Sequence, residues 1–290
     1  MVQFNFEAIG THWQIDIYQD ISSFKEEEIL VSVKNRIEIF DKTYSRFRTD
    51  SLVTEMSKKV GIYILPDDAK EMLAVYRDLY IRTNGHVTPL IGNIISDAGY
   101  DAEYSLKQKK DLFEAPKWEN VIEYVYPALT VKQPVLLDFG ACGKGYLVDI
   151  VGGVIEACGI FQYCIDAGGD ILHKGPNSIR VGLENPENNT QALGIYTLQN
   201  GSICGSALNR RKWENFTHVI NPKTLTSPKE ILAVWVATQT ALVADALATG
   251  LFFESAKAFR DRYDFEYLIV RSDFSIEKSP NFSNELFMLG

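Results

Sequence analysis

The sequence predicts an α+β fold, with mixed β-sheets and packed helices in a single domain over residues 1–290. Three observations support this prediction. The first third of the chain has apolar residues at helical spacing, whereas the part after Leu129 consists of short apolar runs separated by glycines. No internal repeat and no low-complexity linker divides the chain. Helices followed by mixed strands and helices are typical of an α+β protein with one shared core.

The N-terminal elements follow from periodicity. Alternating apolar and polar residues predict a strand over His12–Ile17. A helix follows, with Ser22 or Ser23 as its N-cap and apolar residues three or four positions apart, namely Leu30, Val33, Ile37, Phe40 and Tyr44. A second helix is predicted from about Pro66 to Arg82, where Asn84-Gly85 ends an apolar face made of Met72, Val75, Tyr76, Leu79 and Tyr80.

The later elements alternate between strands and helices. Short apolar runs predict strands over residues 135–137, 163–165, 193–198, 232–237 and 267–270. Helical patterns cover Lys144–Cys158 and Ala241–Tyr263. The polar stretch Lys107–Glu119 is interpreted as a surface insertion.

Composition narrows the function classes. The chain has 29 Lys and Arg against 38 Asp and Glu, a net charge of −9 that argues against nucleic acid as a partner. A small anion bound by a lysine, amides and a cation remains compatible with that charge. The N-terminus has no signal-peptide pattern, which predicts a cytoplasmic protein unless a leader has been removed. Asp245 interrupts the longest apolar stretch, so no transmembrane segment is expected, and the four cysteines are interpreted as free thiols.

A glycine-rich segment, Asp138–Gly145, is the first candidate for chemistry. It precedes a predicted helix, whose N-terminal amides and partial positive charge suit a phosphate, and Lys144 adds a full charge. The segment fits neither a Walker loop nor the dinucleotide fingerprint. A tight turn between a strand and a helix is the alternative interpretation.

Two further segments carry acidic residues. Asp166-Ala-Gly-Gly-Asp170 is a glycine turn after an apolar run, and a plain turn between strands is its simplest interpretation. Asp245 and Thr249 are four residues apart, so their oxygens project from one helix face. A carboxylate in such an apolar segment needs a partner, and Mg²⁺ prefers oxygen ligands. The alternative is an N-cap aspartate followed by a threonine bonded to the helix backbone.

The remaining candidates are a histidine and an arginine pair. His218 lies at the end of a β-like run before an Asn-Pro turn, where a structural role and a catalytic role are both open. Arg46 and Arg48 flank Phe47 at the end of the first helix, where they could clamp an anion, stack a ring or simply be solvated.

Seven segments, in this order and spacing, resemble the ApbE family of FAD:protein FMN transferases. They are Gly10–Trp13, Ser45–Ser51, Asn84–Gly92, Asp138–Gly145, Asp166–Asp170, Thr217–Thr224 and Ala244–Thr249. The resemblance covers about Gly10 to Phe253. It implies a single domain with a T-fold-related architecture that binds FAD in a cleft.

The resemblance also implies a reaction and its residues. FMN would be transferred from FAD to a Thr or Ser hydroxyl of an acceptor flavoprotein, with Mg²⁺ as cofactor and AMP as product. The metal ligands would be Asp245, Thr249 and the main-chain carbonyl of Ala141. The FAD site would be lined by Ile9, Phe47, Gly85, His86, Val87, Thr88, Asp138, Lys144, Val219 and Ile220. His218 matches the histidine linked to the transfer step, and an alternative has Asp166 or Asp170 as the base, with His218 orienting the phosphate.

Three departures from the family pattern concern the transfer step. Thr88 replaces the usual Asp of the Asn-Gly loop, Asn221 replaces the usual Asp before Pro222, and the Cys204–Asn209 region differs from the usual Ser-Gly-x-Tyr. Two other functions are therefore kept beside the transferase. One is a Mg²⁺-dependent FAD pyrophosphatase that yields FMN and AMP, and the other is a non-catalytic protein that binds flavin or nucleotide. Family members are mostly exported, so a removed leader remains an alternative to a cytoplasmic protein.

Overall fold

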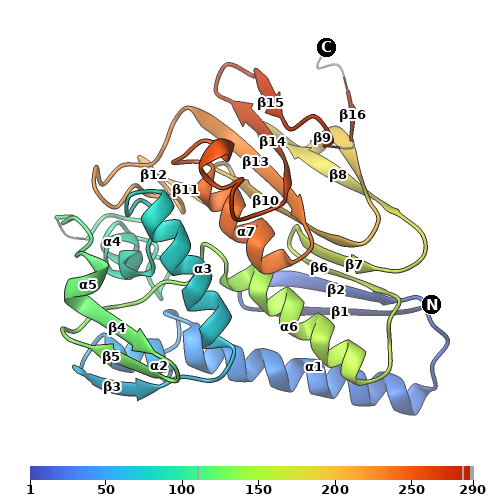
Figure 1. Cartoon of the computed structure of the whole chain (residues 1–290), viewed down its shortest axis with the longest axis horizontal. Coiled ribbons are helices and arrows are strands. Elements are labelled where there is room, and N and C mark those ends of the chain that lie inside the picture. The colour runs from blue at the N-terminus through green and yellow to red at the C-terminus, as the bar shows by residue number, and fades with distance from the viewer. Residues whose placement is uncertain (110, 283, 288–290) are drawn as a thin grey trace.

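The computed structural model describes residues 1–109, 111–282 and 284–287. Its centre is an antiparallel sheet of eight strands in the order β1-β2-β6-β7-β10-β13-β14-β15 (Figure 1). The strands are β1 (Val2–Ala8), β2 (Thr11–Ile17), β6 (Tyr163–Ala167), β7 (Asp170–Lys174), β10 (Gly201–Ala207), β13 (Ile231–Thr238), β14 (Glu266–Arg271) and β15 (Ile276–Lys278). Strands from both ends of the chain are therefore joined in one sheet.

Three helices pack on one face of this sheet. They are α1 (Ser23–Tyr44), α6 (Gly143–Ala157) and α7 (Ala241–Gly250), and α6 contacts both of the others (Figure 1). Ser22 caps α1, because its side chain accepts the amide of Lys25. Trp13, Ile15 and Ile17 of β2 are fully buried in the largest apolar core, together with the inner face of α1. The period of two in β2 thus points its apolar side chains at the helices.

A second, smaller sheet covers part of the opposite face. It has the order β16-β9-β8, from β8 (Ile179–Asn185), β9 (Asn188–Leu198) and β16 (Asn284–Leu286). Leu183 and Leu193 of this sheet share a core with Ile203 and Trp235 of the central sheet. That core draws on β7, β10, β13 and β14, so the small sheet lies over these strands.

The remaining elements lie outside the two sheets described above. They are α2 (Leu52–Met56), β3 (Gly61–Ile64), α3 (Ala69–Arg82), the short helices η1 (Pro89–Ile91), α4 (Gly92–Asp97) and α5 (Trp118–Val121), and β4 (Ile122–Val125) with β5 (Ala128–Val131). Strands β3, β5 and β4 form a three-stranded sheet, and α3 packs against α7 (Figure 1). Strands β11 (Lys212–Trp213) and β12 (Phe216–Thr217) form a small hairpin, and η2 (Ala256–Ala258) follows α7. Loops from these elements border the site described below.

The α+β prediction is confirmed, whereas several element boundaries were wrong. Residues 135–137 form no strand, because they pair with no other strand of the described chain: the amide of Val135 donates to Met56 at the end of α2, and the amide of Asp138 donates to Pro89 at the start of η1. The last helix ends at Gly250 instead of Tyr263, and strand β1 was missed. The inner face of α1 includes Ile29 in place of the half-buried Leu30.

The outcomes of four further predictions, on an insertion, a membrane span, the cysteines and the number of domains, differ. The stretch 107–119 is irregular up to α5, as expected of an insertion, although Trp118 is buried and residue 110 lies outside the described residues. Among the described residues, no helix is long and apolar enough to cross a membrane. The cysteines are free, as predicted. The division of the chain into a single domain stays a prediction.

Candidate active site

Two adjoining cavities of about 120 and 340 Å³ lie beside the N-terminus of α6. Both are lined by five residues, namely Arg46, Phe47, Asp138, Gly140 and Arg211, so they form one cleft with two lobes. The smaller lobe extends toward His218 and Thr249, and the larger one toward Lys144 and Gly10. The cleft is therefore built where the α6 N-terminus meets loops from distant parts of the chain.

Most residues that the sequence proposed for an FAD site line this cleft. The smaller lobe has His86, Val87, Thr88, Val219 and Ile220. The larger lobe has Ile9 and Lys144, and both lobes are lined by Phe47 and Asp138. Gly85 instead lines a neighbouring cavity with Lys223 and Pro222. Chain folding thus gathers nine of the ten positions in one place, although this placement does not by itself identify their ligand.

Asp138 is held in place by a buried arginine. Its carboxylate pairs with Arg46, whose side chain is only 3% exposed, and it also accepts the Gly140 amide at 2.7 Å. Arg46 in turn donates to the Tyr100 carbonyl at 2.6 Å and stacks on the rings of Phe47 and Tyr100. Because its carboxylate already has these partners, Asp138 fixes the shape of the glycine-rich loop and the entrance to α6.

Lys144 is the cation at the base of the larger lobe. Its Nζ pairs with Asp170, a carboxylate with no exposed surface, while Asp245 accepts the Gly145 amide at 2.9 Å. Burial alone would lower the pKa of Lys144, but the charges of Asp170 and Asp245 raise it overall. Lys144 is therefore a stable positive charge beside the amides of the α6 N-terminus, an arrangement that suits a phosphate.

Helix α7 carries two candidate oxygen ligands, Asp245 and Thr249, and the turn before α6 carries a third, the Ala141 carbonyl. Thr249 Oγ1 donates to the Ala141 carbonyl at 3.4 Å, and Asp245 lies one turn earlier on the same helix. Thr240 caps α7, and the Asp149 carboxylate accepts the amides of Ala241 and Leu242 at 2.8 Å, so Asp245 is not an N-cap. Burial first, and then the charge of Asp170, raise the pKa of Asp245 well above its usual value.

The chemistry of this oxygen set suits a magnesium ion. A carboxylate, a hydroxyl and a carbonyl are hard ligands, and Mg²⁺ completes such a partial set with water and substrate phosphates. A cation would also offset the burial of the Asp245 charge. Within the described residues, no cluster of three or more His, Cys, Asp or Glu side chains is arranged to hold a metal. The donor chemistry therefore fits a cation that is shared with a phosphate ligand rather than one fully enclosed by protein.

His218 lies at the wall of the smaller lobe. Its main-chain amide donates to the Arg211 carbonyl at 3.1 Å, and its ring Nδ1 is buried with no hydrogen-bond partner in the described part of the chain. Burial, with the charges of Arg211 and Lys144, lowers the pKa of His218 to about 4. The imidazole is thus neutral at pH 7, and its Nδ1 has no hydrogen-bond partner among the described residues.

The two aspartates of the glycine turn point to different places. Asp170 is buried against Lys144, whereas Asp166 lines a groove on the other face of the central sheet, where it accepts the Gly169 amide at 2.8 Å. Gly168 allows this tight turn with φ of +62°, and an added Cβ would lie 2.0 Å from Thr11 Oγ1. Only Asp170 therefore contacts a residue of the cleft.

Two residues of the cleft, Arg211 and Tyr76, were not predicted from the sequence, and the sequence left the role of a third, Arg46, open. Arg211 lines both lobes, Arg46 orders Asp138, and the hydroxyl of Tyr76 accepts the Ala141 amide at 3.1 Å. Arg46 stood in a motif that was noted, but composition does not distinguish a buried guanidinium from a solvated one. Tyr76 was assigned to an apolar helix face, and Arg211 carried no signal beyond its basic neighbours.

Comparison with known proteins agrees with this architecture. A solved flavin transferase ApbE from Vibrio cholerae superposes with a TM-score of 0.79 over 97% of both chains at 18% identity. The ApbE protein from Thermotoga maritima gives 0.81 over 97% of both chains, also at 18% identity. The fold is therefore the one that flavin transferases adopt.

The family follows from the sequence comparison. The model of the ApbE family matches residues 9–267, so the chain belongs to the ApbE family. Curated relatives named FAD:protein FMN transferase include one from Escherichia coli K12, 24% identical over 97% of this chain and 88% of the relative. Another, from Haemophilus influenzae, is 26% identical over 94% of this chain and 87% of the relative.

Proposed function

We propose that this protein transfers FMN from FAD to a Thr or Ser hydroxyl of an acceptor flavoprotein and releases AMP, with Mg²⁺ as its cofactor. The chain is a transferase of the ApbE family, and its curated relatives carry the name of this activity. One observation supports the proposal most strongly. Lys144, the α6 N-terminus and the unpartnered Nδ1 of His218 border the same cleft, next to the oxygens of Ala141 and Thr249.

Binding of FAD would use both the charged and the aromatic parts of the cleft. Lys144 and the first amides of α6 provide positive potential for the pyrophosphate. Phe47 stacks on Tyr104 with ring centroids 5.4 Å apart, and the His86 ring stacks on Phe253 at 5.6 Å, so each lobe has an aromatic wall. Planar ring systems such as those of FAD gain from offset stacking on such walls.

Asp245, Thr249 and the Ala141 carbonyl would hold Mg²⁺. When bound, this ion would neutralise charge on the pyrophosphate oxygens. Lys144 would hold the AMP side of the pyrophosphate, where negative charge develops as the bond breaks. The cleft residues would also keep the phosphorus fixed relative to the incoming hydroxyl, since positioning is a large part of phosphoryl-transfer catalysis.

His218 would act as the base. Its Nδ1 is buried and has no partner among the described residues, and the low pKa keeps it neutral, so it can accept the hydroxyl proton. The hydroxyl oxygen then bonds to the FMN phosphorus as the bond to the AMP oxygen breaks, and AMP leaves with that electron pair. Asp170 is paired with Lys144, and Asp166 does not line the cleft that would hold the FAD phosphates, so geometry favours His218 over either aspartate.

The departures near His218 are compatible with this function. The Asn221 side chain accepts the amides of Lys223 and Thr224, at 2.9 and 3.2 Å, and an aspartate could make the same turn contacts. Thr88 caps η1 by accepting the Leu90 amide at 3.2 Å. Both substituted side chains therefore stabilise local backbone, which a polar oxygen of either residue type can do.

The test is a product assay with purified protein, FAD and Mg²⁺. Total protein from cells that lack this enzyme serves as the acceptor, and AMP is measured by chromatography while protein-bound flavin is measured by in-gel fluorescence. AMP that forms only with acceptor, together with a fluorescent protein band, is the expected result. AMP and free FMN without acceptor would identify a pyrophosphatase instead, and intact FAD in both reactions would identify a binding protein.

A further inference from the structure

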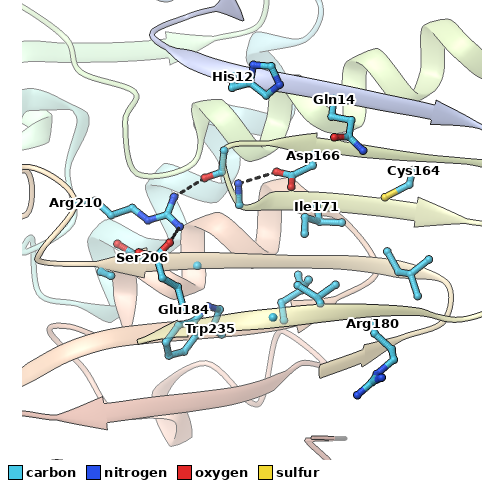
Figure 2. Close-up of a pocket in the computed structure, with 18 of the residues that line it drawn as sticks. His12, Gln14, Cys164, Asp166, Ile171, Arg180, Glu184, Ser206, Arg210 and Trp235 are labelled. Atoms are coloured by element: carbon cyan, nitrogen blue, oxygen red, sulfur yellow. Dashed lines mark hydrogen bonds and ion pairs between the residues drawn. The ribbon is translucent and has the colours of Figure 1, made fainter. Parts of the chain in front are cut away.

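A second cavity, of about 520 Å³, lies on the face of the central sheet opposite the helices (Figure 2). It is bounded by β2 and β6, by parts of β7, β10 and β13, and by β8 of the small sheet. None of its lining residues also lines the cleft. We call this cavity the groove.

The floor of the groove is the polar face of β2 and β6. Since side chains alternate along a strand, the residues of β2 that do not face the helices, His12, Gln14 and Asp16, point into the groove. Cys164 and Asp166 of β6 do the same (Figure 2). The small sheet shares its core with the later strands and leaves this polar strip uncovered.

The wall of the groove is the edge of β8. In the order β16-β9-β8, this strand pairs with β9 on one side only, and residues 179–182 and 184 line the groove. Within the described chain, no main-chain group of residues 179–184 bonds outside the β8–β9 pair. Such an edge presents a row of free N–H and C=O groups to which another extended chain can pair.

One end of the groove adjoins the cleft. Arg210 lines that end and donates to the Gly168 carbonyl at 2.8 Å and to Glu184 at 2.9 Å (Figure 2). The glycine turn leads directly to Asp170, the partner of Lys144. Arg211, the residue that follows Arg210, lines the cleft. A chain lying in the groove would therefore end beside the phosphate-binding part of the cleft.

The groove floor favours hydrogen-bond donors. Asp16 accepts bonds from Gln3 and Gln14, and Asp166 accepts the Gly169 amide, but neither carboxylate forms an ion pair within the described residues. Hydroxyl and amine side chains can supply the missing donors. An extended segment with such side chains on its lower face complements both the floor and the free edge of β8.

We propose that the groove holds an extended segment of the acceptor protein, which adds to β8 as a further strand and presents its Thr or Ser at the Gly168–Gly169 end. This inference rests on the proposed transferase function and specifies how its protein substrate is recognised. Strand addition supplies affinity through the main chain, while the polar floor selects side chains. FAD and acceptor thus approach the catalytic residues from opposite faces of the central sheet.

The experiment blocks the groove without touching the cleft. Gln14→Trp fills the middle of the floor, and Gln133→Trp makes the same change at an exposed loop position outside the groove. The probe is the flavin-free form of the acceptor that becomes fluorescent in the assay described above. Gln14→Trp is expected to raise the KM for this acceptor at least about tenfold, with unchanged FAD affinity, whereas Gln133→Trp leaves both unchanged.

A second measurement addresses strand addition itself. Hydrogen exchange of the wild-type protein with the flavin-free acceptor should slow at alternate amides of residues 179–184, because only every second amide of a strand points outward. The docking proposal would be overturned if the wild type transfers FMN but Gln14→Trp leaves the KM for the acceptor unchanged, or if the acceptor does not protect the amides of β8. Either result would leave the transferase function intact. A wild type that attaches no flavin would overturn the function, and the docking proposal with it.

Discussion

Arg46 and Asp138 form a buried ion pair at the boundary of both lobes of the cleft, 92 positions apart in sequence. The pair joins the end of the first helix to the loop that opens α6. Removing one member of a buried pair leaves the other charge uncompensated, which destabilises proteins by about 3–5 kcal/mol. We therefore expect Arg46→Ala to lower the free energy of unfolding by a few kcal/mol and to weaken FAD binding.

Arg48→Ala is the matched control for Arg46→Ala. Arg48 pairs with Asp41 and Asp50 but is far more exposed than Arg46, so its loss should lower the free energy of unfolding much less than the loss of Arg46 does. Chemical denaturation and a flavin fluorescence titration measure the two quantities. Equal effects of both variants would show that the Arg46–Asp138 pair has no special role.

Gly145 is required for the contact between α6 and α7. A Cβ at this position would lie 2.2 Å from the Ala241 carbonyl and 2.7 Å from Asp245, whereas a Cβ at Gly153 of the same helix meets nothing within 4 Å. Gly145→Ala should therefore separate the helices and lower stability by about 2 kcal/mol or more. Gly153→Ala should be neutral, or stabilise by up to about 1 kcal/mol through helix propensity. Thermal unfolding of both variants would contradict this expectation if their midpoints shifted alike.

The lowered pKa of His218 makes a specific prediction for the pH dependence of the rate. With a pKa near 4 instead of 6.5, the imidazole stays neutral as the pH falls from 8 to about 5 and protonates only below that range. The value of kcat/KM for FAD reports on the free enzyme, so its acid limb should lie near pH 4. A tenfold loss of kcat/KM per pH unit below pH 6.5 would show that burial does not hold His218 neutral.

Metal dependence can be tested through Asp245. Asp245→Ala removes the one carboxylate of the oxygen set and should abolish Mg²⁺-dependent release of AMP. Thr249→Val removes the hydroxyl and should raise the Mg²⁺ concentration needed for half-maximal rate. Circular dichroism checks that both variants are folded. Unchanged AMP release by a folded Asp245→Ala protein would rule out the metal assignment.

Local patterns predicted many elements of the fold. The helix capped by Ser22 and the helix after the glycine-rich segment follow from local spacing and capping, which sequence records directly. Residues 135–137 have the apolar pattern of a strand, but a strand needs a partner strand, and the amide of Val135 instead bonds to Met56 at the end of α2. The end of α7 at Gly250 could likewise not be predicted from the sequence, because the residues directly after it are also apolar.

The site was predictable where it follows a motif and not where it depends on packing. Asp166 and Asp170 belong to one short motif, yet the turn between them directs one to the groove and the other to Lys144. Arg211 reaches the cleft, while its neighbour Arg210 lines the groove. Such separation of adjacent residues is decided by the tertiary structure, and neither composition nor spacing reports it.

The central claim is that the FMN part of FAD goes to a protein hydroxyl rather than to water. The most direct test measures, in one reaction of purified enzyme, FAD, Mg²⁺ and flavin-free acceptor, the amounts of AMP and of flavin that remains on denatured acceptor. We expect one covalently held flavin for each AMP released, and neither product without acceptor. AMP accompanied by free FMN, with no flavin on the acceptor, would contradict it.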